Sequence, residues 1–112
     1  MCAERTPDAS VDVGGTYRYA GALRGTIRLE QTGGTARIVN TTYENANDRP
    51  LVGTGSLAGN VFDVRLVPEN GDTDYEAEVT FVFAEGGDTF CVEFSDTNGD
   101  RGPLGSYTGR RL

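Results

Sequence analysis

The chain has 112 residues and a formal net charge of −7, which is enough length for one domain and a charge that nucleic-acid backbones and anionic lipids repel. It contains no histidine and no lysine, so all ten basic residues are arginines. The usual general base near neutral pH is therefore missing, which disfavours most hydrolase chemistry and excludes nucleophiles that need a histidine. No apolar run approaches the roughly 18 residues of a membrane-spanning helix.

The first 13 residues are small, polar and proline-containing, which is typical of a flexible tether (1–13) before a single domain (14–112). Cys2 follows the initiating Met, as in a bacterial lipoprotein whose leader has been removed and replaced by a Met. This interpretation makes Cys2 a lipidation site and places the protein in the cell envelope or outside the cell. Two alternatives stay open: a plain flexible N-terminus, and a disulfide between Cys2 and Cys91.

From residue 14 onward, short alternating runs of apolar and polar residues are separated by Gly, Asn and Asp clusters, a pattern that indicates strands joined by turns. Eight strands are predicted, at 15–20, 23–31, 35–43, 50–57, 60–67, 74–84, 88–95 and 103–110. Short connections make neighbouring strands antiparallel, and closure removes the free edges. We therefore predict an all-β fold, an eight-stranded antiparallel up-and-down barrel, with a two-sheet β-sandwich as the alternative.

Alternation along each strand assigns one face to the core. The inward set includes Ile27, Leu29, Phe62, Val64, Leu66, Ala77, Val79, Phe81, Phe83, Phe90, Val92 and Phe94. Gly25, Gly53 and Gly55 point the same way, which fits either a ligand slot or size complementarity in a packed core. About sixteen large apolar residues point inward, so a filled interior is the default expectation. Cys91 is on the outward face and is expected to be an inert strand residue.

Gly15 and Tyr17 on the first strand, with Arg110 at the end of the last, resemble the closure residues of the calycin barrels, the group of lipocalins, fatty-acid-binding proteins and avidins. Those families open with Gly-x-Trp and pack a basic side chain of the last strand across the ring; here Tyr17 stands in place of the Trp. The resemblance implies that these three residues close one end of the barrel. It also implies a lipocalin-like carrier of a small hydrophobic ligand, although no Trp is present for avidin-like biotin binding.

The long connections follow the third, fifth and seventh strands, and in a meander they lie at the same end of the barrel. Their acidic residues form a predicted rim of Glu44, Asp48, Glu69, Asp72, Asp74, Asp96 and Asp100. Carboxylates gathered in this way favour a nearby cation or the basic surface of a protein partner. The alternative is that the acidic loops serve solubility alone.

Residues 96–100 begin like a calcium loop, with the pattern D-x-N-x-D. An EF-hand needs Gly at the sixth position and Glu at the twelfth, where this chain has Arg101 and Tyr107. The EF-hand interpretation is therefore rejected. Another kind of Ca²⁺ site stays open, with oxygen ligands from Asp72, Asp74, Asp96, Asn98 and Asp100, and no other cofactor is expected.

These observations predict a protein that is not an enzyme, because only carboxylate pairs or a bound metal remain as routes to catalysis. The favoured function is a surface-tethered binding or inhibitor module that presents its acidic rim to a protein partner or a cation. The alternative function is a carrier that holds a small hydrophobic ligand inside the barrel. Neither nucleic acid nor a transmembrane segment is expected.

Overall fold

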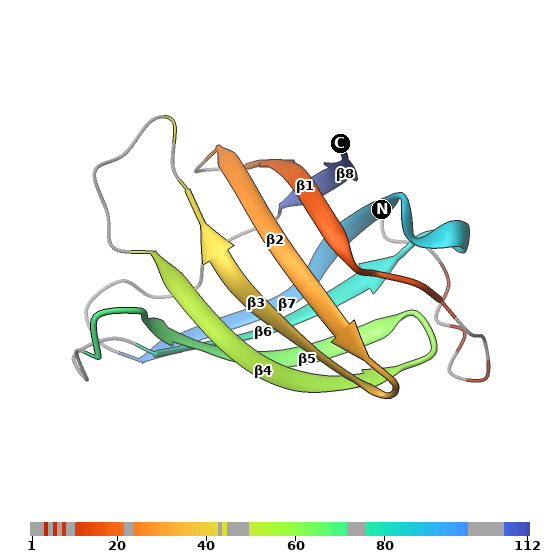
Figure 1. Ribbon diagram of the computed structural model, residues 1–112, viewed down its shortest axis with the longest axis horizontal. Helices are drawn as coiled ribbons and strands as arrows, with labels where there is room; N and C mark the ends of the chain where they lie inside the picture. The colour runs from red at the N-terminus through yellow and green to blue at the C-terminus, as the bar shows by residue number, and fades with distance from the viewer. Residues whose placement is uncertain are drawn as a thin grey trace.

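The protein is a closed barrel of eight antiparallel strands that follow one another in sequence order (Figure 1). The computed structural model describes residues 4, 6, 8, 11–21, 24–42, 44, 50–71, 76–98 and 107–112, without the side chains of 85 and 93–98. The strands are β1 (Gly15–Ala20), β2 (Gly25–Thr32), β3 (Thr35–Thr41), β4 (Leu51–Ala58), β5 (Val61–Pro68), β6 (Glu76–Phe83), β7 (Thr89–Asn98) and β8 (Thr108–Arg111), and a 3-10 turn, η1 (Glu85–Gly87), joins β6 to β7.

The predicted all-β barrel is confirmed. Because β1 pairs with β8, the sheet closes on itself, and the two-sheet sandwich is wrong. Of the predicted last strand, 103–110, residues 103–106 lie outside the described part of the chain, and β8 begins at Thr108. The described part of the chain contains no apolar helix of membrane-spanning length.

Two tight turns fix the hairpins β2–β3 and β4–β5. In each turn a glycine takes a positive φ, 59° at Gly33 and 60° at Gly59, a conformation that glycine adopts without steric cost. Both turns and η1 lie at one end of the barrel, which we call the closed end (Figure 1). The connections that follow β3, β5 and β7 leave the strands at the opposite end, as the meander order predicts.

Aromatic rings fill the closed end. The ring centroid of Phe81 lies 5.7 Å from that of Phe62 and 5.0 Å from that of Phe90. Tyr17 meets Phe83 and Phe90 edge to face. All five rings are at most 4% exposed, and burying side chains of this size stabilises the fold by roughly 1.5–3 kcal/mol each. The inward face assigned by alternation is confirmed for these residues.

Gly25, Gly53 and Gly55 are small because neighbouring backbone lies directly against them. A Cβ at Gly53 would lie 2.0 Å from the carbonyl oxygen of Arg65, and one at Gly55 would lie 1.9 Å from that of Asp63. At Gly25 a backbone carbonyl just after β3 would be 1.7 Å away. No side chain fits at such distances, so these glycines permit close strand approach in a narrow barrel. This favours the packed-core interpretation over a ligand slot.

The N-terminal segment packs on the barrel from Val11 onward. Val11 and Val13 are 8% and 0% exposed and belong to the core. The Gln31 side chain holds both, because Val13 N donates to its Oε1 at 2.8 Å and its Nε2 donates to the Val11 carbonyl at 3.3 Å. Val11 and Val13, at the end of the predicted tether 1–13, therefore pack against the barrel.

Asn60, in the β4–β5 turn, forms hydrogen bonds with the backbone of Glu4 and Thr6, near the N-terminus. Its Nδ2 donates to the carbonyl oxygens of Glu4 and Phe83 at 2.8 Å each. Its Oδ1 accepts from Thr6 N at 2.6 Å. Asn60 is 3% exposed, and its hydrogen bond to the Phe83 carbonyl is buried. At Glu4 and Thr6 the chain is held against the barrel, unlike a free tether.

Arg111, and not Arg110, closes the barrel over Tyr17. Its guanidinium carbon lies 5.4 Å from the Tyr17 ring centroid, and its Nη2 donates to the Tyr17 hydroxyl at 2.9 Å and to the Gly87 carbonyl at 3.0 Å. The prediction for Arg110 was wrong because Arg111 is the residue that pairs with Tyr17 across β1 and β8. The closure role of Gly15 is consistent with the structure, since its φ is 139° and a Cβ there would touch Arg111 at 3.6 Å.

Tyr17 and Arg111, the two residues that close the barrel, also interact electrostatically. Burial raises the pKa of Tyr17 above its ordinary value of 10.0, although Arg111 acts in the opposite direction. The hydrogen bond to Tyr17 raises the pKa of Arg111 in turn. The Tyr17 hydroxyl donates to the Gly87 carbonyl at 2.7 Å while it accepts from Arg111. A neutral phenol and a charged guanidinium therefore join β1, β8 and the β6–β7 connection.

Candidate binding surface

The acidic rim predicted from the sequence lies mostly outside the described residues. Glu44 and Glu69 are described, and both are exposed. The other predicted residues are Asp48, Asp72, Asp74 and Asp100, which lie outside the described part, and Asp96 and Asn98, of which only the backbone is described. Among the described residues, no three His, Cys, Asp or Glu side chains form a group that would hold a metal ion. The rim and its Ca²⁺ site stay predictions.

Cys91 is disulfide-bonded. It lies on the outward face of β7, as alternation predicted, and is 9% exposed. The sequence predicted an inert strand residue, with a disulfide between Cys2 and Cys91 as an alternative, and Cys91 does form a disulfide. The chain has one other cysteine, Cys2, which lies outside the described residues. A disulfide is typical of proteins that fold in an oxidising compartment.

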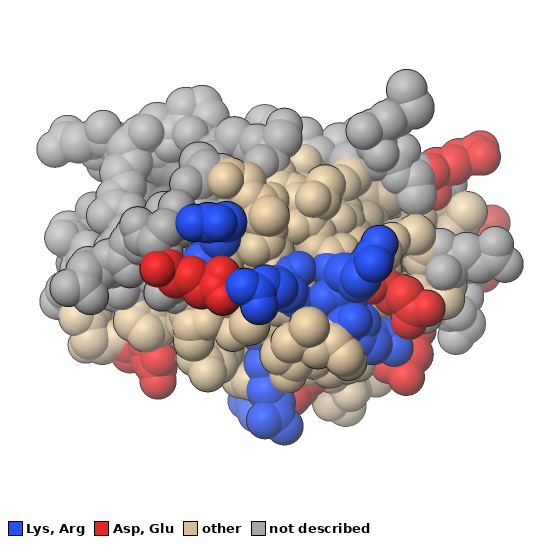
Figure 2. All heavy atoms as spheres, turned by 90° about the horizontal axis from the view of Figure 1, so that it is seen from above, with Lys and Arg blue, Asp and Glu red and all other residues tan. Residues whose placement is uncertain are grey.

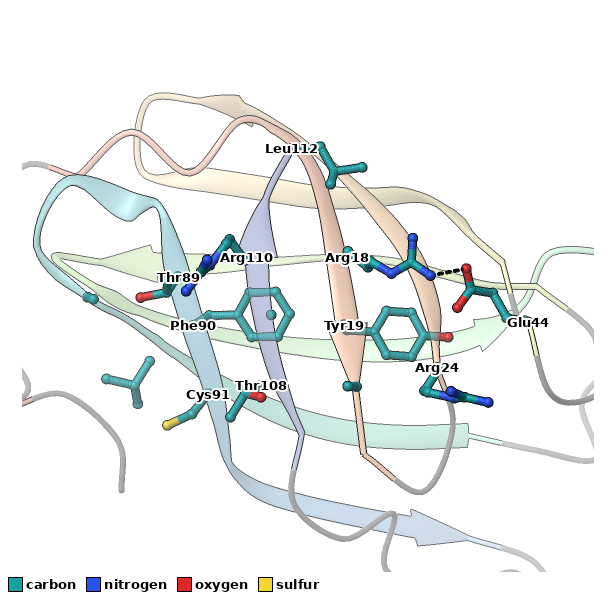
Figure 3. A pocket seen from close by; sticks show the side chains of 14 residues that line it. Arg18, Tyr19, Arg24, Glu44, Thr89, Phe90, Cys91, Thr108, Arg110 and Leu112 are labelled. Carbon is teal, nitrogen blue, oxygen red and sulfur yellow. Dashed lines mark hydrogen bonds and ion pairs between the residues drawn. The ribbon is translucent and has the colours of Figure 1, made fainter.

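A groove of about 740 Å³ crosses the outer face of β8, between β7 and β1 (Figure 3). It is lined mainly by outward-facing residues of these strands and of the end of β6. Three arginines and one glutamate line it: Arg18, Arg24, Arg110 and Glu44. The groove is thus locally positive on a chain whose net charge is −7.

Arg18 and Arg110 lie side by side in this groove. Strand β1 pairs with β8 so that the two residues are direct cross-strand partners, and both are exposed. Like charges placed directly opposite each other destabilise a sheet. The pairing of Arg18 with Arg110 therefore does not stabilise the barrel. The barrel is closed by Arg111, on the inner side of β8. The two paired side chains extend apart along the groove, Arg18 toward Glu44 and Arg110 toward Thr89 (Figure 3), and each guanidinium is suited to hold an anionic group.

Glu44 neutralises one of the two guanidinium groups. Its backbone N donates to the carbonyl oxygen of Arg24 at 2.7 Å, which fixes it beside β1. Its carboxylate Oε1 then lies 2.5 Å from Nη2 of Arg18, the contact drawn in Figure 3. Among the described residues, Arg110 has no acidic partner. Of the paired arginines, Arg18 therefore already holds a carboxylate, and Arg110 holds none among the described residues.

Two arginines elsewhere on the outer surface, Arg37 and Arg65, lie beside acids. Arg65 contacts Glu76 and Glu78 at 3.0 Å each, and its hydrogen bond to Glu78 raises its pKa. Arg37 contacts Glu30 at 2.9 Å. Each of these arginines thus pairs with an acid on an adjacent strand, whereas Arg110 has no acidic partner among the described residues.

The basic surface extends from the groove onto β2. Arg28 is exposed on the outer face of β2, opposite Thr16 of β1. Figure 2 shows arginine side chains gathered in a band over one side of the molecule, with acidic side chains beside its ends. The positive charge on the described surface is therefore concentrated on the side formed by β8, β1 and β2.

Apolar side chains line the rest of the groove. Val82 faces outward on β6 and yet is only 1% exposed. The Phe90 ring lies against Gly109, where a Cβ would come within 2.3 Å of the ring. Leu112 borders the groove and is 74% exposed. Apolar walls with a few convergent charged groups are typical of ligand and partner sites.

Comparisons with protein-family models, with curated proteins and with solved structures found no match to this chain. The closed barrel of eight antiparallel strands in sequence order is compatible with the calycin-like architecture that the sequence resembles. A fold of this kind does not define a function, because one architecture carries many activities. The function must therefore be argued from the surface of this chain.

The groove itself was missed in the sequence analysis. Part of the signal is the alternation of the first strand, which places Arg18 on its outer face. In a closed meander the first and last strands are neighbours, and the register of β1 with β8 brings Arg110 opposite Arg18. The pairing was overlooked because Arg110 had been assigned to the closure of the barrel, a role that belongs to Arg111.

Proposed function

We propose that this protein is a non-enzymatic binding module that recognises an anionic ligand or partner in the groove over β8. The observation that carries the proposal is the direct pairing of Arg18 with Arg110 on the outer face. Arginine binds carboxylates and other oxyanions through two parallel hydrogen bonds. The chain as a whole carries a net charge of −7 and therefore repels a long polyanion. A groove that is positive only locally favours an anionic group on a compact ligand.

The absence of an enzymatic role is supported by the chemistry that the sequence offers. The chain has no histidine and no lysine, which are the common general bases near neutral pH. Tyr17 and Arg111, whose pKa values are both shifted, are held by hydrogen bonds in the closed end of the barrel. They lie on the inner side of β1 and β8, whereas the groove lies on the outer side, so we assign them to the stability of the barrel.

An interior carrier, the function that the calycin resemblance implies, has less support. Tyr17, Phe62 and Phe83 are fully buried and fill the closed end. The glycines that might have outlined a slot are instead in contact with backbone. The acidic rim as a docking surface rests on the sequence alone.

We further propose that the protein works in the cell envelope or outside the cell. The disulfide at Cys91 supports this location, because the reducing cytosol does not maintain such bonds in most organisms. A lipid anchor at Cys2 is a competing prediction from the sequence, because one sulfur cannot hold both a lipid and a disulfide.

Amide chemical-shift mapping distinguishes a groove from an interior site. We expect citrate, a compact tricarboxylate, to shift the amides of Ala20, Thr108 and Gly109 saturably at low ionic strength. Laurate, a fatty acid, should leave the amides of Phe62 and Phe83 unchanged. Saturable laurate shifts inside the barrel, with no response of the groove to citrate, would overturn the proposal in favour of the carrier.

A further inference from the structure

We propose that the groove binds an acidic segment of a protein partner, and that a carboxylate of this segment replaces the carboxylate of Glu44 on Arg18. The inference rests on the proposed function, because it assigns a specific occupant to the same groove. Glu44 would then be an internal competitor that occupies part of the site until the partner arrives.

The contact between Glu44 and Arg18 has the properties of an exchangeable one. The two side chains are 41% and 59% exposed, and their nitrogen and oxygen atoms are 2.5 Å apart. Exposed ion pairs of this kind are weak because water and salt screen them. The geometry shows that the Arg18 guanidinium accepts a carboxylate from the groove side, and a ligand carboxylate is able to take the same place.

Arg110 supplies a second carboxylate site beside the first. It is the direct cross-strand partner of Arg18, and paired backbones in a sheet lie about 5 Å apart. The two guanidinium groups extend in opposite directions from these strands, Arg18 toward Glu44 and Arg110 toward Thr89 (Figure 3). An extended peptide that crosses β8 and β1 with acidic residues spaced along it therefore matches the pair.

The apolar part of the groove favours a peptide over other anions. Leu112 borders the groove beside the arginines and is 74% exposed, so a peptide with an apolar side chain next to its acids contacts both kinds of surface. Nucleic acids and long sulfated polysaccharides extend beyond a groove of about 740 Å³ and meet a chain of net charge −7. Closure of the barrel leaves β8 paired on both sides, so side chains, and not an added strand, must provide the recognition.

The test measures the affinity of a fluorescein-labelled hexapeptide of alternating Glu and Leu for the full chain by fluorescence anisotropy at low salt. Glu44→Gln removes the competitor and should tighten binding by about two- to fivefold, the strength of an exposed ion pair. Arg18→Gln and Arg110→Gln should each weaken it by about tenfold. Arg65→Gln, on the outer face of β5, is the matched control and should have little effect.

Each other outcome has a defined meaning. If Glu44→Gln leaves the affinity unchanged or weakens it, or if a matched peptide of Gln and Leu binds equally well, the proposal is wrong. If the acidic peptide does not bind while citrate still shifts the groove amides, the proposed function stands and the acidic segment is rejected as the occupant. If only heparin, anionic vesicles or a second copy of the chain, detected by sedimentation, occupies the groove, the occupant is different and the peptide is again rejected. Failure of every anion at the groove overturns the proposed function itself.

Discussion

Arg18 of β1 and Arg110 of β8 are direct cross-strand partners on the outer face of the barrel, with their side chains on the same side of the sheet. Only Arg18 has an acidic neighbour among the described residues, and that neighbour is Glu44. The next residue along β8, Arg111, points inward and closes the barrel over Tyr17. Two consecutive arginines thus have different roles: Arg110 lies exposed in the groove, and Arg111 closes the barrel.

Replacing each of these arginines by methionine separates the two roles. Arg111→Met removes hydrogen bonds to Tyr17, Gly87 and Asp12 and should lower the free energy of unfolding by about 1–3 kcal/mol. Arg110→Met removes an exposed charge and should change it by less than about 0.5 kcal/mol. Urea unfolding followed by circular dichroism measures both. Equal losses in the two variants would contradict the assignment of closure to Arg111.

The stability of the barrel should fall at alkaline pH because of Tyr17. Burial raises the pKa of Tyr17 in the folded state above its ordinary value of 10.0, so above pH 10 the unfolded chain loses this proton more readily than the folded one. The contribution is fully present below pH 10 and is lost as pH rises through the folded pKa. Tyr17→Phe should remove this part of the pH dependence, measured as unfolding free energy between pH 8 and pH 11. An unchanged alkaline slope in the variant would show that another group is responsible.

Gly109 permits the Phe90 ring to lie at the base of the groove. A Cβ at this position would come within 2.3 Å of the ring, so Gly109→Ala should destabilise the protein by about 1–3 kcal/mol through overpacking. Phe90→Leu, which removes the ring, should make the added methyl less harmful. A double-mutant cycle in thermal unfolding measures this coupling, and strictly additive effects would argue against the contact.

The disulfide at Cys91 leads to a prediction about the N-terminus. Because Cys2 is the other cysteine of the chain, we expect it to be the partner, which leaves no free sulfur at Cys2 for a lipid. Peptide mapping without reductant should recover the two cysteines in one cross-linked peptide. Cys91→Ser should then lower the free energy of unfolding by about 2–4 kcal/mol. A free thiol or a thioether at Cys2 in the mature protein would refute the pairing.

Much of the fold could be predicted from the sequence because a half-buried strand leaves a period of two in its residues. Phe62, Val64 and Leu66 alternate with polar residues, and the structure buries all three. The same rule cannot choose between Arg110 and Arg111, since a shift of one residue reverses the face of every side chain. Only the register with β1, fixed by the pairing of Tyr17 with Arg111, decides the question.

The candidate site was harder to predict because its residues come from opposite ends of the chain. Arg18 and Arg110 are brought together by closure between the first strand and the last. The role of Glu44 was also hidden, since a backbone hydrogen bond to Arg24 places its carboxylate beside Arg18. In the sequence, Glu44 can be recognised only as one acidic residue of a long polar loop.

The central claim, that the groove and not the overall charge binds the anion, is tested most directly with two variants of equal net charge. Arg18→Glu with Arg110→Glu reverses the groove, and Arg37→Glu with Arg65→Glu makes the same change of charge elsewhere on the outer surface. The measurement is the dissociation constant of citrate, followed at the amide of Gly109. We predict that it rises about tenfold or more in the groove variant and less than about twofold in the control. An equal loss of affinity in both variants would contradict the account.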